Sequence, residues 1–156
     1  LYTSPDNEKA LKAQSLEAVR NLSFVSCREW KVDWKTLEIL GPIQLFHVNR
    51  WKFMPRMVAA GRCDVLLAPF QPTDDMSMET ESGTLVPIPG IKISLSGTRH
   101  FGIARRQHLK PVLDQGIAHL REQGIIEKAY TESGFFNTRV RDWKLLAASA
   151  SNVQGA

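Results

Sequence analysis

The chain has 156 residues, of which 43% are apolar and 23% charged, a composition typical of a globular protein with one ordinary domain or two small lobes. Its formal charge of +4 comes without a Lys/Arg block, so nucleic-acid binding is not indicated, and no apolar run approaches the roughly 20 residues that span a bilayer. Two cysteines make neither a disulfide framework nor a metal-ligand cluster.

The first forty residues alternate between extended and helical patterns. In chain order they predict a β-like start at 1–3, a turn at 4–6, a helix at 7–21, a strand at 22–26 and a short helix at 34–40. Asp33 is a suitable cap for the second helix, and Gly41-Pro42 ends it.

The stretch from 41 to 70 predicts the unit around which the fold is organised. It reads as a strand at 43–48, a helix at 51–60 ended by Gly61, and a strand at 64–70. Asn49 is expected to cap the helix. Two such strands around one helix form a parallel βαβ unit with a right-handed crossover. A ligand would then bind in the crevice outside the carboxyl ends of the strands.

The second half of the sequence is expected to hold a long helix between extended segments. In chain order the patterns predict an exposed acidic loop at 71–83, an extended segment at 85–93, a strand at 100–105, a helix from Pro111 to about 130, a short docked helix at 140–146 and a loose tail. Pro87 and Pro89 are expected to keep the extended segment out of a sheet centre. Gly116 and Gly124 argue against one straight helix. The apolar side of that helix is formed by Val112, Leu113, Ile117, Leu120 and Ile125.

Two stretches resemble a known family. MVAAGRCDVLLAPF resembles the helix, Gly-Arg-x-Asp and apolar strand of periplasmic solute-binding proteins with the type 2 fold, in the amino-acid-receptor-like group (bacterial extracellular solute-binding family 3). HFGIARRQHLKPVLDQGIAHLREQGIIEKAY resembles the closing segment of that group, in which a strand and a long helix return to the first lobe.

The resemblance implies an α/β protein of the periplasmic-binding-protein type 2 fold, comprising lobe 2 and the C-terminal return to lobe 1. The implied divisions are a hinge strand at 1–3, lobe 2 at 4–93, the C-terminal part of lobe 1 at 94–146 and a flexible tail at 147–156. The N-terminal part of lobe 1 would be missing, so the apolar side of the long helix is expected to stay exposed, self-associate or pair with the missing half.

Three loops at strand ends are predicted to reach the ligand. Their residues are Ser26, Cys27, Arg28, Trp30, Asn49, Arg50, Trp51, Phe70 and Gln71. Arginines offer bidentate contacts to an anion, and the aromatic rings offer flat apolar walls. The competing interpretations are that Arg28 and Arg50 are solvated surface residues and that Asn49 is only a cap. Trp34 is expected to serve packing, and Asp64 to anchor a local turn.

One departure from the family bears on the ligand. Amino-acid receptors place an acidic residue, which pairs with the ligand's ammonium, at the position that is Pro69 here. The resemblance therefore implies an anionic ligand such as a carboxylate.

The predicted function is non-enzymatic capture of a small solute in the periplasm for ABC-type uptake, by closure of two lobes and without a cofactor or metal. No signal peptide is visible at Leu1, so a targeting segment is expected upstream or already removed. The alternatives are a ligand-sensing domain of a signalling or regulatory protein and, less favoured, a thiol enzyme that uses Cys27 with a pKa lowered by Arg28.

Overall fold

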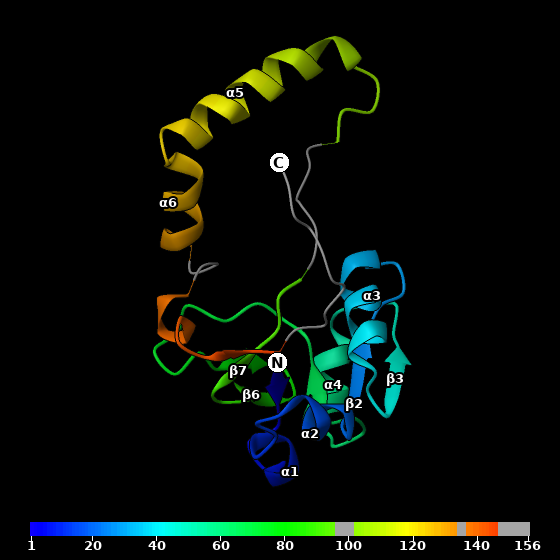
Figure 1. Ribbon diagram of the computed structural model, residues 1–156. Helices are drawn as coiled ribbons and strands as arrows, with labels where there is room; N and C mark the ends of the chain where they lie inside the picture. The colour runs from blue at the N-terminus through cyan, green and yellow to red at the C-terminus, as the bar shows by residue number, and fades with distance from the viewer. Residues whose placement is uncertain (96–101, 134–136, 147–156) are drawn as a thin grey trace.

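A six-stranded mixed sheet organises the chain, with helices on both faces and a helical arm above it (Figure 1). The computed structural model describes residues 1–95, 102–133 and 137–146. The strand order is β3-β2-β4-β1-β6-β5. The strands are β1 (Tyr2–Thr3), β2 (Ser23–Ser26), β3 (Gln44–His47), β4 (Val65–Leu66), β5 (Met78–Thr80) and β6 (Gly83–Pro87).

Strand β2 is the centre of the parallel part of the sheet. It pairs in parallel with β3 on one side and with β4 on the other, so the predicted parallel βαβ arrangement is confirmed, although β3 and β4 are not neighbours. The chain runs from β2 through α3 (Lys31–Leu40) to β3, and then through α4 (Phe53–Ala59) to β4. The remaining pairings, β4 with β1, β1 with β6 and β6 with β5, are antiparallel.

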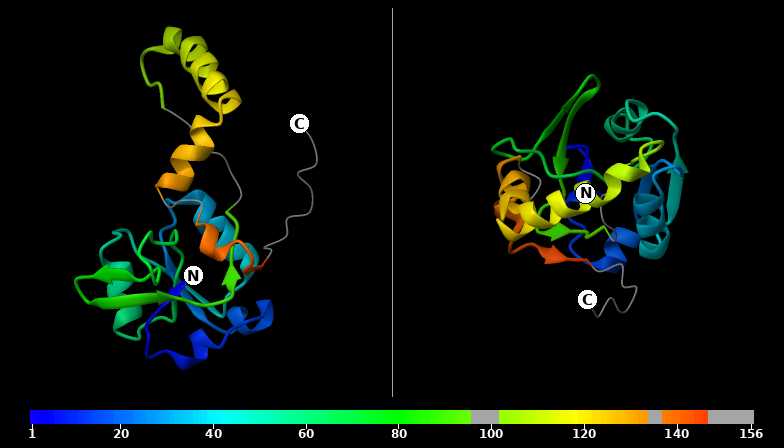
Figure 2. Two further views of the ribbon diagram at one scale, coloured as in Figure 1. Left: turned by 90° about the vertical axis from the view of Figure 1, so that its left-hand side faces the viewer. Right: turned by 90° about the horizontal axis from the view of Figure 1, so that it is seen from above.

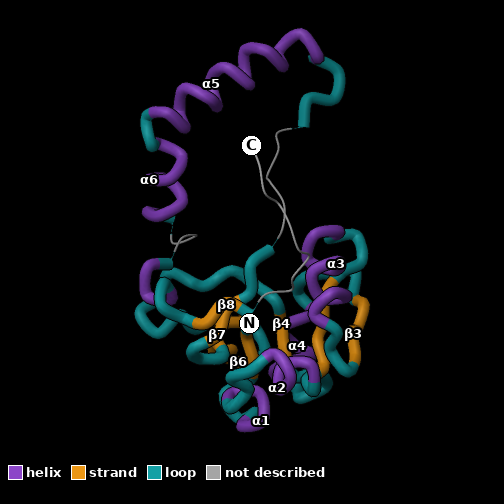
Figure 3. Tube along the Cα trace, in the orientation of Figure 1, coloured by secondary structure: helices purple, strands orange, loops and turns teal. Residues whose placement is uncertain are grey.

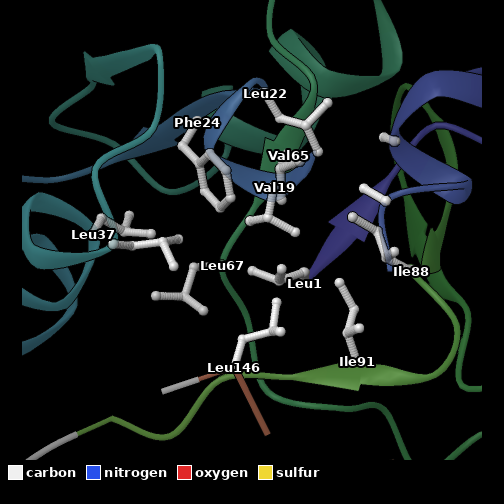
Figure 4. Close-up of a cluster of buried hydrophobic side chains, with 13 residues drawn as sticks. Leu1, Val19, Leu22, Phe24, Leu37, Val65, Leu67, Ile88, Ile91 and Leu146 are labelled. Carbon is white, nitrogen blue, oxygen red and sulfur yellow. The ribbon is translucent and has the colours of Figure 1, made fainter. Parts of the chain in front are cut away.

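The two helices lie on opposite faces of the sheet, as the alternation of side chains along β2 requires. Phe24 belongs to a buried cluster with Leu37 and Leu40 of α3, drawn in Figure 4, whereas Val25 belongs to a second cluster with Met54 and Val58 of α4. Because the crossovers run in opposite directions along the sheet and use opposite faces, they have the same hand.

The predicted helix at 7–21 is instead two short helices, α1 (Glu8–Leu11) and α2 (Leu16–Arg20). Asn7 accepts a hydrogen bond from the Ala10 backbone N–H at 3.1 Å, and Ser15 accepts one from the Ala18 N–H at 3.1 Å. Asn7 therefore caps α1 and Ser15 caps α2. The apolar periodicity alone had predicted that the first helix continues through Ser15.

The predicted caps of α3 and α4 are wrong, although the predicted stops are right. α3 begins at Lys31, so Asp33 lies in its first turn, and α4 begins at Phe53 after Lys52, so Asn49 lies outside it. Gly41 takes the left-handed conformation, with φ of 74°, and its N–H bonds to the Leu37 carbonyl at 3.0 Å. A glycine adopts this terminating geometry without the Cβ clash of other residues.

The region after β4 contains more sheet than the sequence predicted. β5 forms a hairpin with β6, and Met76, Ser77 and Met78 are buried inside the predicted exposed loop. The segment at 85–93 is extended as expected, but β6 lies between β1 and β5 rather than at an edge. Pro87 fits there because it is the last residue of its strand.

The C-terminal segment docks as a strand, so the predicted helix at 140–146 is wrong. After a short 3₁₀ turn, η2 (Thr138–Val140), β8 (Lys144–Leu145) pairs in parallel with β7 (Ile91–Lys92). The Lys92 ammonium donates to the Val140 and Arg141 carbonyls at 2.6 and 2.7 Å, and Leu146 joins the cluster of Figure 4. Strand pairing with β7 and burial of Leu146 outweigh the local helical preference of this segment. Neither contact can be seen in the local sequence pattern.

The helical arm stands away from the sheet in the left view of Figure 2 and in Figure 3. It consists of η1 (Gln107–Leu109), α5 (Lys110–Glu122) and α6 (Ile125–Glu132), and Gly124, with φ of 68°, separates the two α-helices. Pro111 lies in the first turn of α5 as predicted. The predicted strand at 100–105 is absent from 102–105, and its first two residues lie outside the described part.

The apolar side of the arm is exposed and not packed against the sheet. Neither α5 nor α6 contains a buried residue, and Val112 is 67% exposed. That a missing part of lobe 1 covers this face stays a prediction. None of the helices in the described ranges combines the length and apolar character needed to cross a bilayer.

Candidate functional site

The carboxyl ends of β2 and β3 lie side by side and form the base of the site. Ser26 is the register partner of His47, and the Val48 N–H donates to the Ser26 carbonyl at 2.9 Å. The Arg28 backbone N–H donates to Nδ1 of His47 at 3.2 Å. The loop after β2 is thus attached to the end of β3, as the predicted parallel arrangement required.

Within the first loop, the buried Cys27 thiol donates to a carboxylate oxygen of Glu29 at 2.8 Å. This hydrogen bond raises the pKa of Cys27 and lowers the pKa of Glu29, because it stabilises the protonated thiol and the ionised carboxylate. A raised thiol pKa is the opposite of what a nucleophilic cysteine needs, so the expected lowering by Arg28 is wrong.

Aromatic rings join the first two loops into one site. The rings of Trp30 and Trp51 lie 5.9 Å apart between centroids, at 37° to each other. The Arg28 guanidinium lies 5.3 Å from the centre of the Trp34 ring, and the same ring meets His47 edge-on at 5.9 Å. Trp34 therefore holds Arg28 and His47, a role that goes beyond the packing predicted for it.

The second loop presents its polar residues to solvent. Asn49 and Arg50 are exposed, and neither side chain has a hydrogen-bond or ionic partner among the described residues. Trp51 is 42% exposed, although its ring contacts Trp30. Of the two arginines predicted to bind ligand, Arg28 contacts the Trp34 ring, whereas the Arg50 guanidinium has no partner among the described residues.

The third loop is held by the rest of the protein rather than presented freely. The Gln71 backbone N–H donates to the Tyr2 hydroxyl at 2.9 Å, and this hydroxyl donates to the Met76 carbonyl at 2.8 Å. The Phe70 ring meets Trp143 edge-on at 5.4 Å. Phe70 is therefore half-buried in a C-terminal contact, which makes it a poorer ligand wall than predicted.

Burial, followed by repulsion from the Asp75 carboxylate, raises the pKa of Tyr2.

One hollow brings the second and third loops together. It has a volume of about 340 Å³ and is lined by Trp51, Lys52, Pro55, Arg56, Gln71, Met78, Glu79, Thr80 and Glu81. The cationic side chains of Lys52, just before α4, and of Arg56 within it meet carboxylates from the β5–β6 hairpin there, and Arg56 is ion-paired with Glu81. The hairpin residues were not among the predicted site residues, because the sequence pattern there predicted an exposed loop.

A second hollow runs along α4 and contains none of the predicted site residues. Its volume is about 610 Å³, and its lining is Val48, Phe53, Arg56, Met57, Ala59, Ala60, Arg62 and Ser82. It is larger than the first, but it lies along α4 and not at the junction of the first two loops. The candidate site therefore lies at the carboxyl ends of β2 and β3.

Asp64 has a structural role, as predicted, but it joins segments that are distant in the sequence and does not anchor a local turn. Its carboxylate accepts hydrogen bonds from the Asn7 side chain at 2.9 Å, the Ser23 backbone N–H at 2.8 Å and the Ser23 hydroxyl at 2.7 Å. Burial alone would raise the pKa of Asp64, but these bonds outweigh it and lower the pKa. Asp64 thus ties the start of α1 to the starts of β2 and β4, at the end of the parallel strands opposite the site.

The described fold and site define a mixed α/β protein whose parallel strands bring two loops together at their carboxyl ends. Comparison of the chain with protein-family models, with curated proteins and with solved structures finds no match.

Two residues that the sequence analysis did not select, Glu29 and His47, lie in the middle of this site. A histidine as the last residue of a strand that enters the crevice was the available signal for His47. Glu29 had no signal of its own beyond its place in the same loop.

Proposed function

We propose that this chain supplies the ligand-binding lobe of a periplasmic solute-binding protein with the type 2 fold, which captures a small anionic solute for ABC-type uptake. The observation that carries the proposal is the meeting of the loops after β2 and β3, where the tilted rings of Trp30 and Trp51 lie side by side and the Arg50 side chain has no partner among the described residues. Flat apolar walls beside a free guanidinium suit a small carboxylate.

The topology of the sheet supports a binding role by placing a crevice between the ends of β2 and β4, next to the site at the ends of β2 and β3. From β2 the chain crosses to one side to form β3, and then returns across β2 to form β4 on the other. Such a reversal is a topological switch point, where the loops after neighbouring parallel strands diverge and leave a crevice at their carboxyl ends. Cys27 and Arg28 follow β2 at this point, and Leu67 follows β4.

Arg50 and Pro69 favour an anion over a zwitterionic amino acid, and the Glu29 carboxylate in the middle of the site already accepts a hydrogen bond from the Cys27 thiol. The position that carries an acidic residue in amino-acid receptors is Pro69, which offers no partner for an ammonium group. Arg50 offers a full positive charge that nothing in the described chain neutralises. The hollow beside Trp51 has balanced charge, so it adds no strong preference of its own.

Calorimetric titration with small mono- and dicarboxylates and with amino acids tests the proposal. A charge-assisted hydrogen bond contributes on the order of 1.5–3 kcal/mol, so Arg50→Ala should weaken carboxylate binding about ten- to a hundredfold. Arg28→Ala should weaken it less, because Trp34 already holds that guanidinium. Arg121→Ala, an exposed arginine on the arm, is the matched control and should change nothing.

Two results would contradict the proposal. One is tight binding of a zwitterionic amino acid that neither Arg28→Ala nor Arg50→Ala affects. The other is the absence of binding to any carboxylate or amino acid by folded protein.

A further inference from the structure

Three side chains with different metal-binding groups converge at the carboxyl ends of β2 and β3. They are the thiol of Cys27, the carboxylate of Glu29 and the imidazole of His47, and one donor atom from each lies within 4.8 Å of the other two. Cys27 is buried, whereas Glu29 and His47 are exposed. The cluster therefore has a fixed inner member and two members that can move toward a bound ion.

The donor set matches a borderline-soft divalent cation. Zn²⁺ binds thiolate sulfur at about 2.3 Å and imidazole nitrogen or carboxylate oxygen at about 2.0–2.2 Å. Hard cations such as Mg²⁺ and Ca²⁺ prefer all-oxygen sites. One thiolate and one carboxylate also supply two negative charges, which neutralise a divalent ion without help from the neutral imidazole.

The backbone around the cluster is already organised. The register of Ser26 with His47 sets the distance between the two strand ends, and the Trp30 N–H closes the turn onto the Cys27 carbonyl at 3.1 Å. The His47 ring is further held edge-on against Trp34. Only side-chain rotations are then needed, because tetrahedral zinc ligands lie roughly 3–4 Å apart.

Binding would replace two weak contacts with coordination bonds. The Cys27 thiol proton, which now points at Glu29, passes to solvent, and the resulting thiolate and the carboxylate both turn to the metal. The metal takes the lone pair on His47 Nδ1 that accepts the Arg28 N–H at 3.2 Å, which leaves the other ring nitrogen protonated. The metal keeps its charge state throughout.

We propose that Cys27, Glu29 and His47 form a binding site for Zn²⁺ at the carboxyl ends of β2 and β3. Three protein ligands leave the fourth tetrahedral position to water or to another small ligand, as in the open class of zinc sites. The inference does not rest on the solute-binding proposal, since it uses neither Arg50 nor the Trp30–Trp51 pair that carry that proposal, although Cys27 lies in the loop that both sites share. It reverses the sequence expectation that the cysteines belong to no metal cluster.

Equilibrium dialysis of the reduced full chain against Zn²⁺ tests the proposal, with Co²⁺ as an absorbing probe. The wild-type protein should bind a single ion per chain, and the Co²⁺ form should show a thiolate-to-cobalt charge-transfer band. Cys27→Ser should lose that band. Glu29→Gln and His47→Gln should each weaken Zn²⁺ binding by more than the roughly 10- to 100-fold that loss of an outer partner of a ligand costs.

The chain offers matched controls for two of the ligands. Cys63→Ala removes the other buried thiol, and His108→Gln removes an exposed histidine on the arm. Both variants should bind Zn²⁺ as the wild type does. Zinc should also slow alkylation of Cys27 in the wild-type protein, read by mass spectrometry of its peptide, and this measurement needs no variant that might fail to fold.

The proposal is overturned if Zn²⁺ binds equally well to Cys27→Ser, if the Co²⁺ form shows no thiolate band, or if zinc leaves the alkylation rate of Cys27 unchanged. Loss of carboxylate binding in Arg50→Ala with zinc binding intact, or the reverse, separates the two proposed sites.

Discussion

Replacement of Asp64 tests how the start of the parallel sheet is held together. Its carboxylate accepts three hydrogen bonds, from the side chain of Asn7 and from the backbone and hydroxyl of Ser23, while its own carbonyl accepts from the Thr3 hydroxyl at 2.8 Å. A change from Asp64 to Ala removes the carboxylate and leaves three donors without their acceptor.

The magnitude follows from these bonds. A hydrogen bond to a charged group contributes about 1.5–3 kcal/mol, but bonds that share one carboxylate are not additive, so Asp64→Ala should lower the free energy of unfolding by roughly 2–4 kcal/mol. Asp64→Asn keeps the shape but turns an NH₂ group toward either Ser23 or Asn7. One donor then faces another donor, and the loss should be roughly 1–2 kcal/mol.

Urea denaturation followed by circular dichroism measures the difference at neutral pH. Asp114→Asn on α5 is the control, because among the described residues its carboxylate pairs with Lys110 alone, one helical turn away, and such an exposed pair contributes about 0.3–0.5 kcal/mol to stability. The reasoning is refuted if Asp64→Ala and Asp114→Asn have the same small effect.

The pH dependence gives an independent check on Asp64. Because its pKa is lowered in the folded protein, its stabilising effect is fully present above the unfolded value of about 3.9 and is lost as the pH falls through the folded pKa. The stabilities of wild type and Asp64→Asn should therefore approach each other in acid. Curves that stay parallel from neutral pH to below the folded pKa would show that the carboxylate charge plays no part.

Two further predictions concern the thiols and the arm. Thiol titration of denatured, unreduced protein should find both cysteines free, and a monomer with no titratable thiol would contradict this. In native protein Cys63 should react slowly, because burial and, to a smaller extent, the Asp64 charge raise the pKa of its thiol to about 12. The exposed apolar face of α5 should bind hydrophobic dye or drive self-association, and Val112→Lys with Leu120→Lys should reduce both; a wild-type monomer by sedimentation with no dye binding would contradict it.

Local signals in the sequence located most of the central elements. The apolar runs around β2, β3 and β4, the helical spacing of α4 and the terminating Gly41 and Gly61 all depend on neighbours within a few residues, so they were predicted before any pairing was known. The two free cysteines were also predicted correctly, whereas Asp64, which was predicted to anchor a local turn, joins the start of α1 to β2.

Capping was less predictable from the same local signals. Asn49 and Asp33 have the side chains of good caps, but α4 and α3 begin elsewhere, whereas Ser15 caps a helix that periodicity had merged with its neighbour. Cap propensity says which residues are able to cap, but the backbone conformation at each position depends on how the helix packs against the sheet.

The candidate site shows the same division between local and distant contacts. Sequence reasoning named Cys27, Arg28, Trp30 and Trp51 from their places after strands, and the structure brings the two tryptophans together. It did not name His47, whose part in the site comes from its register with Ser26, twenty-one positions earlier in the chain.

By itself the sequence determined the local elements, because apolar period, glycine stops and turn residues act over one or two helical turns. Only the tertiary structure decided that β1 lies between β4 and β6, that Pro87 ends an interior strand, and that β8 pairs with β7 instead of forming a helix. These contacts join segments more than fifty residues apart. These contacts stabilise the fold through strand pairing and shared burial. Both depend on distant partners and cannot be inferred from neighbouring residues in the sequence.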